Sequence, residues 1–179
     1  MLTIRVPGKE YFNDTTSEFI TVPERVLRLE HSLVSVSKWE SRWHRPFLSD
    51  DPMTPEQSLD YIRCMSLDDD VPALVYRGIT QAMLRQVENY IQDPMTGTVL
   101  RDSPGTNDST TVTAERIYSR MIAYKIPFTC ENWHLNRLLM LMRVCAAEQT
   151  PPKPMSRQEI FAENQRLNAK RKKELGSNG

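Results

Sequence analysis

The spacing of the apolar positions changes about thirty residues into the chain. Before that point, the stretches 2–6, 18–22 and 25–30 alternate apolar and polar residues, which is typical of β-strands. Pro7 and Gly8 end the first stretch, and residues 13–17 have the composition of a turn. We therefore predict a small antiparallel β unit over about residues 1–30. It must pack on other elements, because an isolated hairpin is marginal in water.

From residue 31 onward, apolar positions recur every three or four residues, which indicates amphipathic helices. The clearest helix start combines Thr54 as N-cap, Pro55 in the first helical position and Gln57 closing a capping box. Thr113 and Thr129 are further N-cap candidates. The predicted helices span about residues 31–44, 54–67, 72–92, 113–126 and 130–147.

Two stretches of this region are less regular. Residues 95–100 fit a short strand, and residues 102–109 have the composition of an exposed, mobile loop. The predicted helix 130–147 is apolar nearly all round. Such a helix lies in the middle of a core or faces a partner on one side.

The C-terminal part has a different character. The three prolines in the predicted linker, residues 150–155, favour a stiff, extended backbone. Ser156 and Glu159 then form a capping box for a last helix, about 156–174, within a basic segment 156–179. We thus predict a mainly α (α+β) protein: a body over 1–149 with its β unit at 1–30, then the linker and a C-terminal helix.

Charge and composition limit the classes of function that the protein can have. The 179 residues have zero net charge, but residues 150–179 contain seven basic and three acidic side chains. That tail therefore has a net charge of +4 and residues 1–149 have −4. Such an asymmetry often marks a segment that binds a partner. The densest basic run lies in the last predicted helix. It either contacts nucleic acid through phosphates or complements the C-terminal helix dipole, and we favour the second. Its members are Lys170, Arg171, Lys172 and Lys173.

The sequence also bears on location. No apolar run approaches the roughly 18 residues that a membrane span needs, and the first residues are too short and broken for a signal peptide. Cys64, Cys130 and Cys145 are odd in number and widely spaced. They form no CxxC metal pair, so we expect reduced, buried thiols in a cytoplasmic protein.

Patterns that support catalysis or cofactor binding are missing from the sequence. It has no G-x-S-x-G, no phosphate-binding glycine loop and no calcium-loop spacing. Cys130 and His134 are four residues apart and would face one side of a helix, as metal ligands or as separate core side chains; we favour the core. We therefore expect no enzyme, no metal and no cofactor.

Nine methionines leave two interpretations open, an adaptable apolar binding surface or the filling of gaps in a core. Trp39, Trp43 and Trp133 are expected to be core anchors.

Several stretches together resemble one family. They are residues 29–41, 133–139, 143–145, 151–156 and 167–176, and the likeness covers about residue 27 to the end. The chain resembles the tail assembly chaperones of long-tailed phages and prophages, encoded between the major tail protein and the tape measure protein. The resemblance gives no residue a role.

The resemblance implies a protein of the host cytoplasm that binds the tape measure protein, keeps it soluble during tail assembly and is absent from the virion. It also implies a longer frameshifted form, for which Lys172 and Lys173 mark a possible slippery site. As contact surface we expect the outward side of helix 130–147, with Leu138 and Met142, and the tail residues Phe161 and Leu167. The alternatives are a structural virion component, such as a tail-completion or head–tail connector protein, and a nucleic-acid-binding regulator.

Overall fold

The computed structural model describes residues 1–14, 17–99, 112–149, 161, 164–168 and 171. The strands are β1 (Leu2–Val6), β2 (Lys9–Asn13), β3 (Glu18–Val22) and β4 (Arg25–Leu29). The helices are α1 (Leu33–Trp43), α2 (Pro55–Met65), α3 (Ala73–Arg77), α4 (Gln81–Gln92), α5 (Ala114–Ala123), the 3-10 helix η1 (Phe128–Asn132) and α6 (Leu135–Gln149). The predicted class, mainly helical with a small N-terminal antiparallel β unit, is confirmed. Contacts divide the chain into a unit Met1–Ala146 and a unit Ala147–Gly179.

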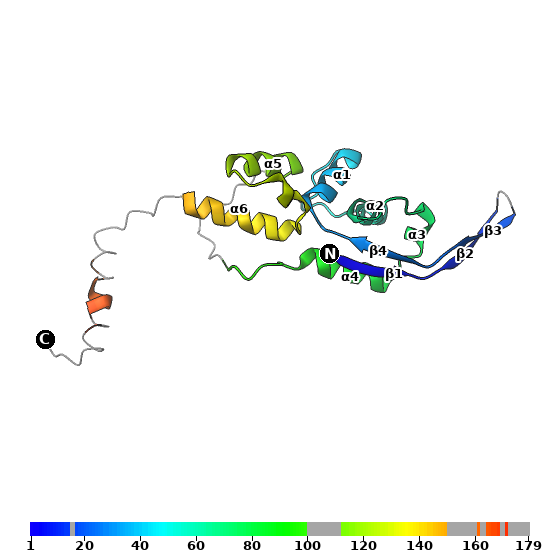
Figure 1. Cartoon of the computed structure of the whole chain (residues 1–179), viewed down its shortest axis with the longest axis horizontal. Helices are drawn as coiled ribbons and strands as arrows, with labels where there is room; N and C mark the ends of the chain where they lie inside the picture. The colour runs from blue at the N-terminus through cyan, green and yellow to red at the C-terminus, as the bar shows by residue number, and fades with distance from the viewer. Residues whose placement is uncertain (15–16, 100–111, 150–160, 162–163, 169–170, 172–179) are drawn as a thin grey trace. The chain divides into compact units, whose positions relative to one another are not determined.

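The four strands form one long two-stranded ribbon, interrupted once on each side. β1 pairs antiparallel with β4, and β2 pairs antiparallel with β3. The breaks fall at residues 7–8 and 23–24, opposite each other (Figure 1). A side chain at Gly8 would lie 3.0 Å from the backbone nitrogen of Glu24, so the two chains approach closely there.

Strand β2 was not predicted. Its sequence begins with two charged residues and places Tyr11 and Phe12 side by side, so it lacks the alternation of a half-buried strand. Pairing with β3 creates it. Of the turn predicted at 13–17, Asn13 belongs to β2, residues 14 and 17 are in turns, and residues 15–16 lie outside the described residues. The other three predicted strands are confirmed.

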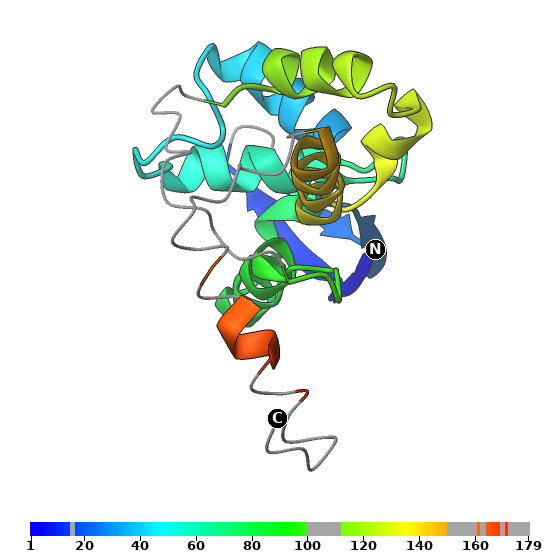
Figure 2. The same ribbon diagram turned by 90° about the vertical axis from the view of Figure 1, so that its left-hand side faces the viewer.

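The β1–β4 half of the ribbon supplies one wall of the core. Its alternate residues Ile4, Val6, Leu27 and Leu29 are buried, as period-two patterning requires. Trp39 of α1 is buried in the same core, and its indole Nε1 donates to the Gln57 carbonyl at 3.0 Å. In both views α1 and α5 lie above this half of the ribbon, and α4 lies below it (Figures 1 and 2).

The helix starts show which caps local sequence can predict. The capping box of Thr54 and Gln57 forms as predicted, with Pro55 as the first residue of α2. Thr113 occupies the N-cap of α5, but its side chain makes no capping hydrogen bond. Instead the carboxylate of Glu40, distant in sequence, accepts from the backbone N–H of Ala114 at 2.8 Å. A negative charge at a helix N-terminus is favourable, so α1 caps α5.

The single helix predicted over 72–92 is wrong: the structure has α3 and α4, with a break at residues 78–80. Gly78 follows α3, and a side chain there would come within 2.8 Å of Val6 Cγ1. Thr80 then caps α4 by accepting from the N–H of Met83. The apolar period continues across the break, which is why the pattern concealed it.

Two further predictions need correction. Residues 95–99 form no strand, because Asp93 and Thr96 bond the backbone N–H groups of Met95 and Thr98 in local turns. The helix expected from 130 begins only at Leu135, after η1. The Leu135 N–H donates to the His31 carbonyl at 2.7 Å, which fixes the start of α6 beside the start of α1.

The predicted loop 102–109, linker 150–155 and capping box of the last helix lie outside the described residues. Residues 161, 164–168 and 171 are helical, in agreement with the predicted C-terminal helix.

Candidate functional site

The predicted contact residues fall into two groups. Leu138 and Met142 are buried in the core on the inner side of α6, so the expectation that they lie on an exposed face is wrong. The helix is apolar nearly all round, and sequence could not say which side faces inward. Phe161 is 66% exposed and Leu167 is also exposed, as a contact surface needs.

The predicted basic run is described at one position. Arg171 is exposed and helical, whereas Lys170, Lys172 and Lys173 lie outside the described residues. The tryptophans behave mostly as expected: Trp39 is fully buried, and Trp43 and Trp133 are half-buried against the core.

An apolar surface on α5 and η1 was not assigned from the sequence. Ile122 is 64% exposed and Phe128 is 53% exposed, although both are large and apolar. Tyr118 lies one turn before Ile122, and its ring centroid is 6.1 Å from that of Phe128. These three side chains form what we call the α5 patch. The opposite side of α5 packs into the core through Ile117 and Met121.

The polar part of the α5 patch is held in place. The Tyr118 hydroxyl donates to the Glu131 carboxylate at 2.8 Å, so η1 and α5 are tied together beside the patch. Partial burial and this acceptor carboxylate raise the pKa of Tyr118, which keeps the phenol neutral. The spacing of Tyr118 and Ile122 is visible in the sequence, but the addition of Phe128 requires the fold.

A second exposed surface is the β2–β3 hairpin, residues 9–22, which we call the arm. Phe12 and Phe19 are paired across its strands, with ring centroids 5.1 Å apart. They are 52% and 70% exposed. Phe12 was not predicted as an exposed site residue, because β2 was not predicted. The signal in the sequence that could have revealed this hairpin is the pair of breaks at residues 7–8 and 23–24 with turn residues between them.

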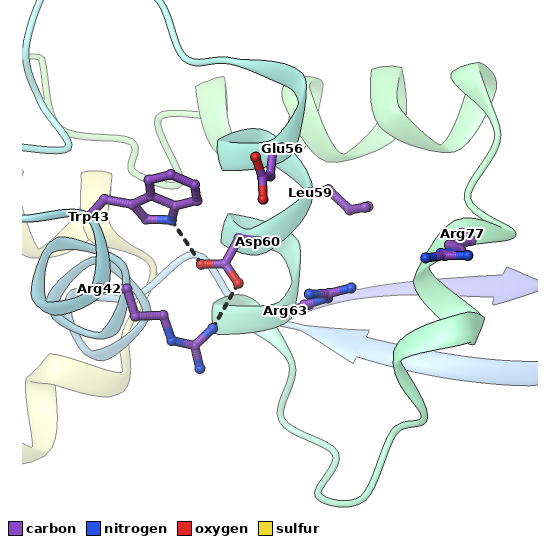
Figure 3. Close-up of a pocket in the computed structure, with 7 residues that line it drawn as sticks. All are labelled: Arg42, Trp43, Glu56, Leu59, Asp60, Arg63 and Arg77. Carbon is purple, nitrogen blue, oxygen red and sulfur yellow. Dashed lines mark hydrogen bonds and ion pairs between the residues drawn. The ribbon is translucent and has the colours of Figure 1, made fainter.

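A pocket of about 420 Å³ opens between α1, α2 and α3. Arg42 and Trp43 line one side, Glu56, Leu59, Asp60 and Arg63 the middle, and Arg77 the far side (Figure 3). We call it the arginine pocket. Its members come from three helices, and no local motif joins them.

The charged side chains of the arginine pocket differ in how many hydrogen-bond partners they have. The Asp60 carboxylate accepts from Arg42 at 2.8 Å and from the Trp43 indole at 3.0 Å, so it is occupied by α1. The guanidinium of Arg63 lies 5.3 Å from the Tyr76 ring centre, and its Nε has no hydrogen-bond partner within the part of the chain that the structure describes. Arg63 and Arg77 are therefore available to an anionic group.

Buried ionisable groups cluster elsewhere, where β4, α1, α2, α4 and α6 meet. His31 Nδ1 and the Tyr61 hydroxyl share a hydrogen bond of 2.5 Å, and Tyr61 also bonds Ser35 at 3.1 Å. Burial, with a contribution from neighbouring His134, lowers the pKa of His31 to about 3. Burial likewise raises the pKa of Tyr61. Both groups are therefore neutral at pH 7 and act as structural hydrogen-bond partners.

His134 is part of the same cluster. Its Nε2 donates to the Tyr90 carbonyl at 2.9 Å, and its Nδ1 accepts from the Asn136 N–H. Both ring nitrogens are thus used, and Cys130 is buried in η1 rather than on the same helix face. Among the described residues, no group of three or more His, Cys, Asp or Glu side chains is arranged to hold a metal ion.

Comparison of the chain with protein-family models, with curated proteins and with solved structures gives no match. In the described segments, no helix combines the length and apolar composition needed to cross a membrane.

Proposed function

We propose that this protein is a non-enzymatic tail assembly chaperone of a long-tailed phage, which binds the tape measure protein in the host cytoplasm and keeps it soluble. The observation that carries the proposal is the α5 patch, in which Ile122 of α5 and Phe128 of η1 lie mostly in solvent, while the other side of α5 packs into the core. Exposed clusters of large apolar side chains mark surfaces that bind partners.

The geometry of the α5 patch fits a helical partner. Tyr118 and Ile122 are four residues apart and form a ridge along α5, against which a second helix can pack. A tape measure protein is a long, largely helical chain with apolar stripes, which aggregate when uncovered. Exposed Phe161 and Leu167 offer further apolar contact on the C-terminal helix. The resemblance of residues 27 onward to the chaperone family supports the same partner.

Co-expression with the neighbouring tape measure protein tests the proposal. We expect the soluble fraction of the tape measure protein to fall strongly when the chain is omitted, and also when it bears both Ile122→Ser and Phe128→Ser. Val99→Ser is the matched control, because Val99 is an exposed apolar residue outside the patch. A tape measure protein that stays soluble without this chain would contradict the proposal.

A second measurement separates the chaperone from a structural virion component. Mass spectrometry of purified particles should detect no stoichiometric amount of this chain. Abundant peptides from it in mature virions would favour a tail-completion or connector protein instead.

A further inference from the structure

The arm has an unusual combination of shape and surface. It continues the ribbon beyond the helices that cover the β1–β4 half (Figure 1). Phe12 and Phe19 are cross-strand neighbours and therefore project from the same face of the arm, where both are exposed. Two-stranded ribbons are marginal in water unless an apolar face is covered. This face of the arm is therefore suited to a partner.

The charge of the arm indicates what that partner offers. Described residues of the arm include the carboxylates Glu10, Asp14 and Glu18 and one cation, Lys9. Glu10 shares the face of Phe12, whereas Glu18, next to Phe19 in β3, projects from the opposite face. No ion pair within the described residues neutralises these carboxylates. The aromatic face thus presents two rings beside the Glu10 carboxylate, and Asp14 adds negative charge in the turn after β2.

The arginine pocket has the complementary character, because the three arginines of its lining outnumber the carboxylates Glu56 and Asp60. Arg63 and Arg77 supply two guanidinium groups that no described carboxylate occupies, while Trp43 and Leu59 supply apolar wall (Figure 3). Its volume of about 420 Å³ lies within the roughly 300–1,000 Å³ typical of binding pockets. Stacking of Arg63 on Tyr76 holds that guanidinium in place, which reduces the entropy lost on binding.

We propose that the arm of one copy of this protein docks in the arginine pocket of a second copy. The aromatic face meets Trp43 and Leu59, and the Glu10 carboxylate on that face pairs with the guanidinium groups of Arg63 and Arg77. Because the arm and the pocket are different surfaces, two copies can exchange arms in a closed two-fold dimer, or the contact can continue head-to-tail into rings or chains. The proposal concerns self-association and does not depend on the tape measure protein.

Analytical ultracentrifugation of the full chain over a range of concentrations tests self-association. Wild-type protein should form species that grow with concentration and dissociate as salt screens the ion pairs. An arm variant with Phe19→Ser and Glu10→Lys, and a pocket variant with Arg63→Glu and Arg77→Glu, should each raise the concentration for half-association at least about tenfold. Arg85→Glu, an exposed charge reversal on α4, is the control and should leave association unchanged.

Mixing the two variants distinguishes this contact from others. The arm variant keeps an intact pocket and the pocket variant keeps an intact arm, so the mixture should form a 1:1 complex although neither variant associates alone. A monomeric wild type at all concentrations would overturn the proposal. So would a pocket variant that associates like wild type, because arm-to-arm pairing needs no arginine pocket. Circular dichroism of each variant confirms that the fold is retained.

Discussion

The two halves of the N-terminal ribbon have the same pairing in different surroundings. In each half, two five-residue strands pair antiparallel in full register. In the β1–β4 half, the inward apolar side chains such as Leu27 are buried under helices. In the β2–β3 half, Phe12 and Phe19 remain in solvent. Large apolar side chains therefore serve stability in one half and remain available for binding in the other, and only burial distinguishes the two roles.

The largest expected difference between the halves is in stability. Leu27→Ala removes a fully buried side chain from β4 and leaves a cavity, so the free energy of unfolding should fall by about 2–5 kcal/mol. Val26→Ala, at the neighbouring exposed position, is the control and should change it by less than about 0.5 kcal/mol. Urea denaturation measures both. If both variants lost the same free energy of unfolding, burial would not distinguish the two sides of β4.

The next largest expected effect is a loss of stability in acid, caused by buried His31 just after β4. The pKa of His31 is about 3 in the folded protein and about 6.5 when exposed, so below pH 6.5 the unfolded chain gains a proton that the folded one does not. Stability is therefore lost as pH falls from 6.5 toward 3, by about 2 kcal/mol at pH 5.

Denaturation at pH 7 and pH 5 measures this loss. His31→Gln should flatten the dependence, whereas His44→Gln, which replaces an exposed histidine, should retain it. If the His31→Gln protein lost as much stability between pH 7 and pH 5 as the wild type does, the loss would come from other groups.

The smallest expected effect is in the arm. Phe12→Ser with Phe19→Ser removes one cross-strand aromatic pair and should change the free energy of unfolding by at most about 1 kcal/mol. Measurement at concentrations where the chain is monomeric isolates the fold from association. A fall as large as that of Leu27→Ala would mean that these rings belong to the core, and the comparison of the two halves would fail.

Local signals predicted much of the fold. The box of Thr54 and Gln57 forms within one turn, so the start of α2 is readable from four residues. The break at residues 78–80 was missed because the apolar spacing continues across it, although Gly78 and Thr80 are local signals of a helix end and a helix start. The capping of α5 by Glu40 was missed because Glu40 and Ala114 are 74 residues apart in the sequence.

The candidate sites show the same limit more strongly. Phe161 and Leu167 were selected from the sequence and are exposed, whereas Leu138 and Met142 were selected with them and are buried. All four side chains are apolar, so apolar character alone does not tell the exposed pair from the buried pair. The arginine pocket left no sequence signal, since Arg42, Arg63 and Arg77 come from three helices.

Local patterns along the chain were enough to predict the class, three of the four strands and the helix starts that neighbouring residues cap, because those signals act over a few residues. Packing settles which apolar side of α5 and α6 is covered, which strand pairs with β2 and which arginines share a pocket. Each of those outcomes depends on atoms brought together from distant segments, and a pattern along one chain does not contain that information.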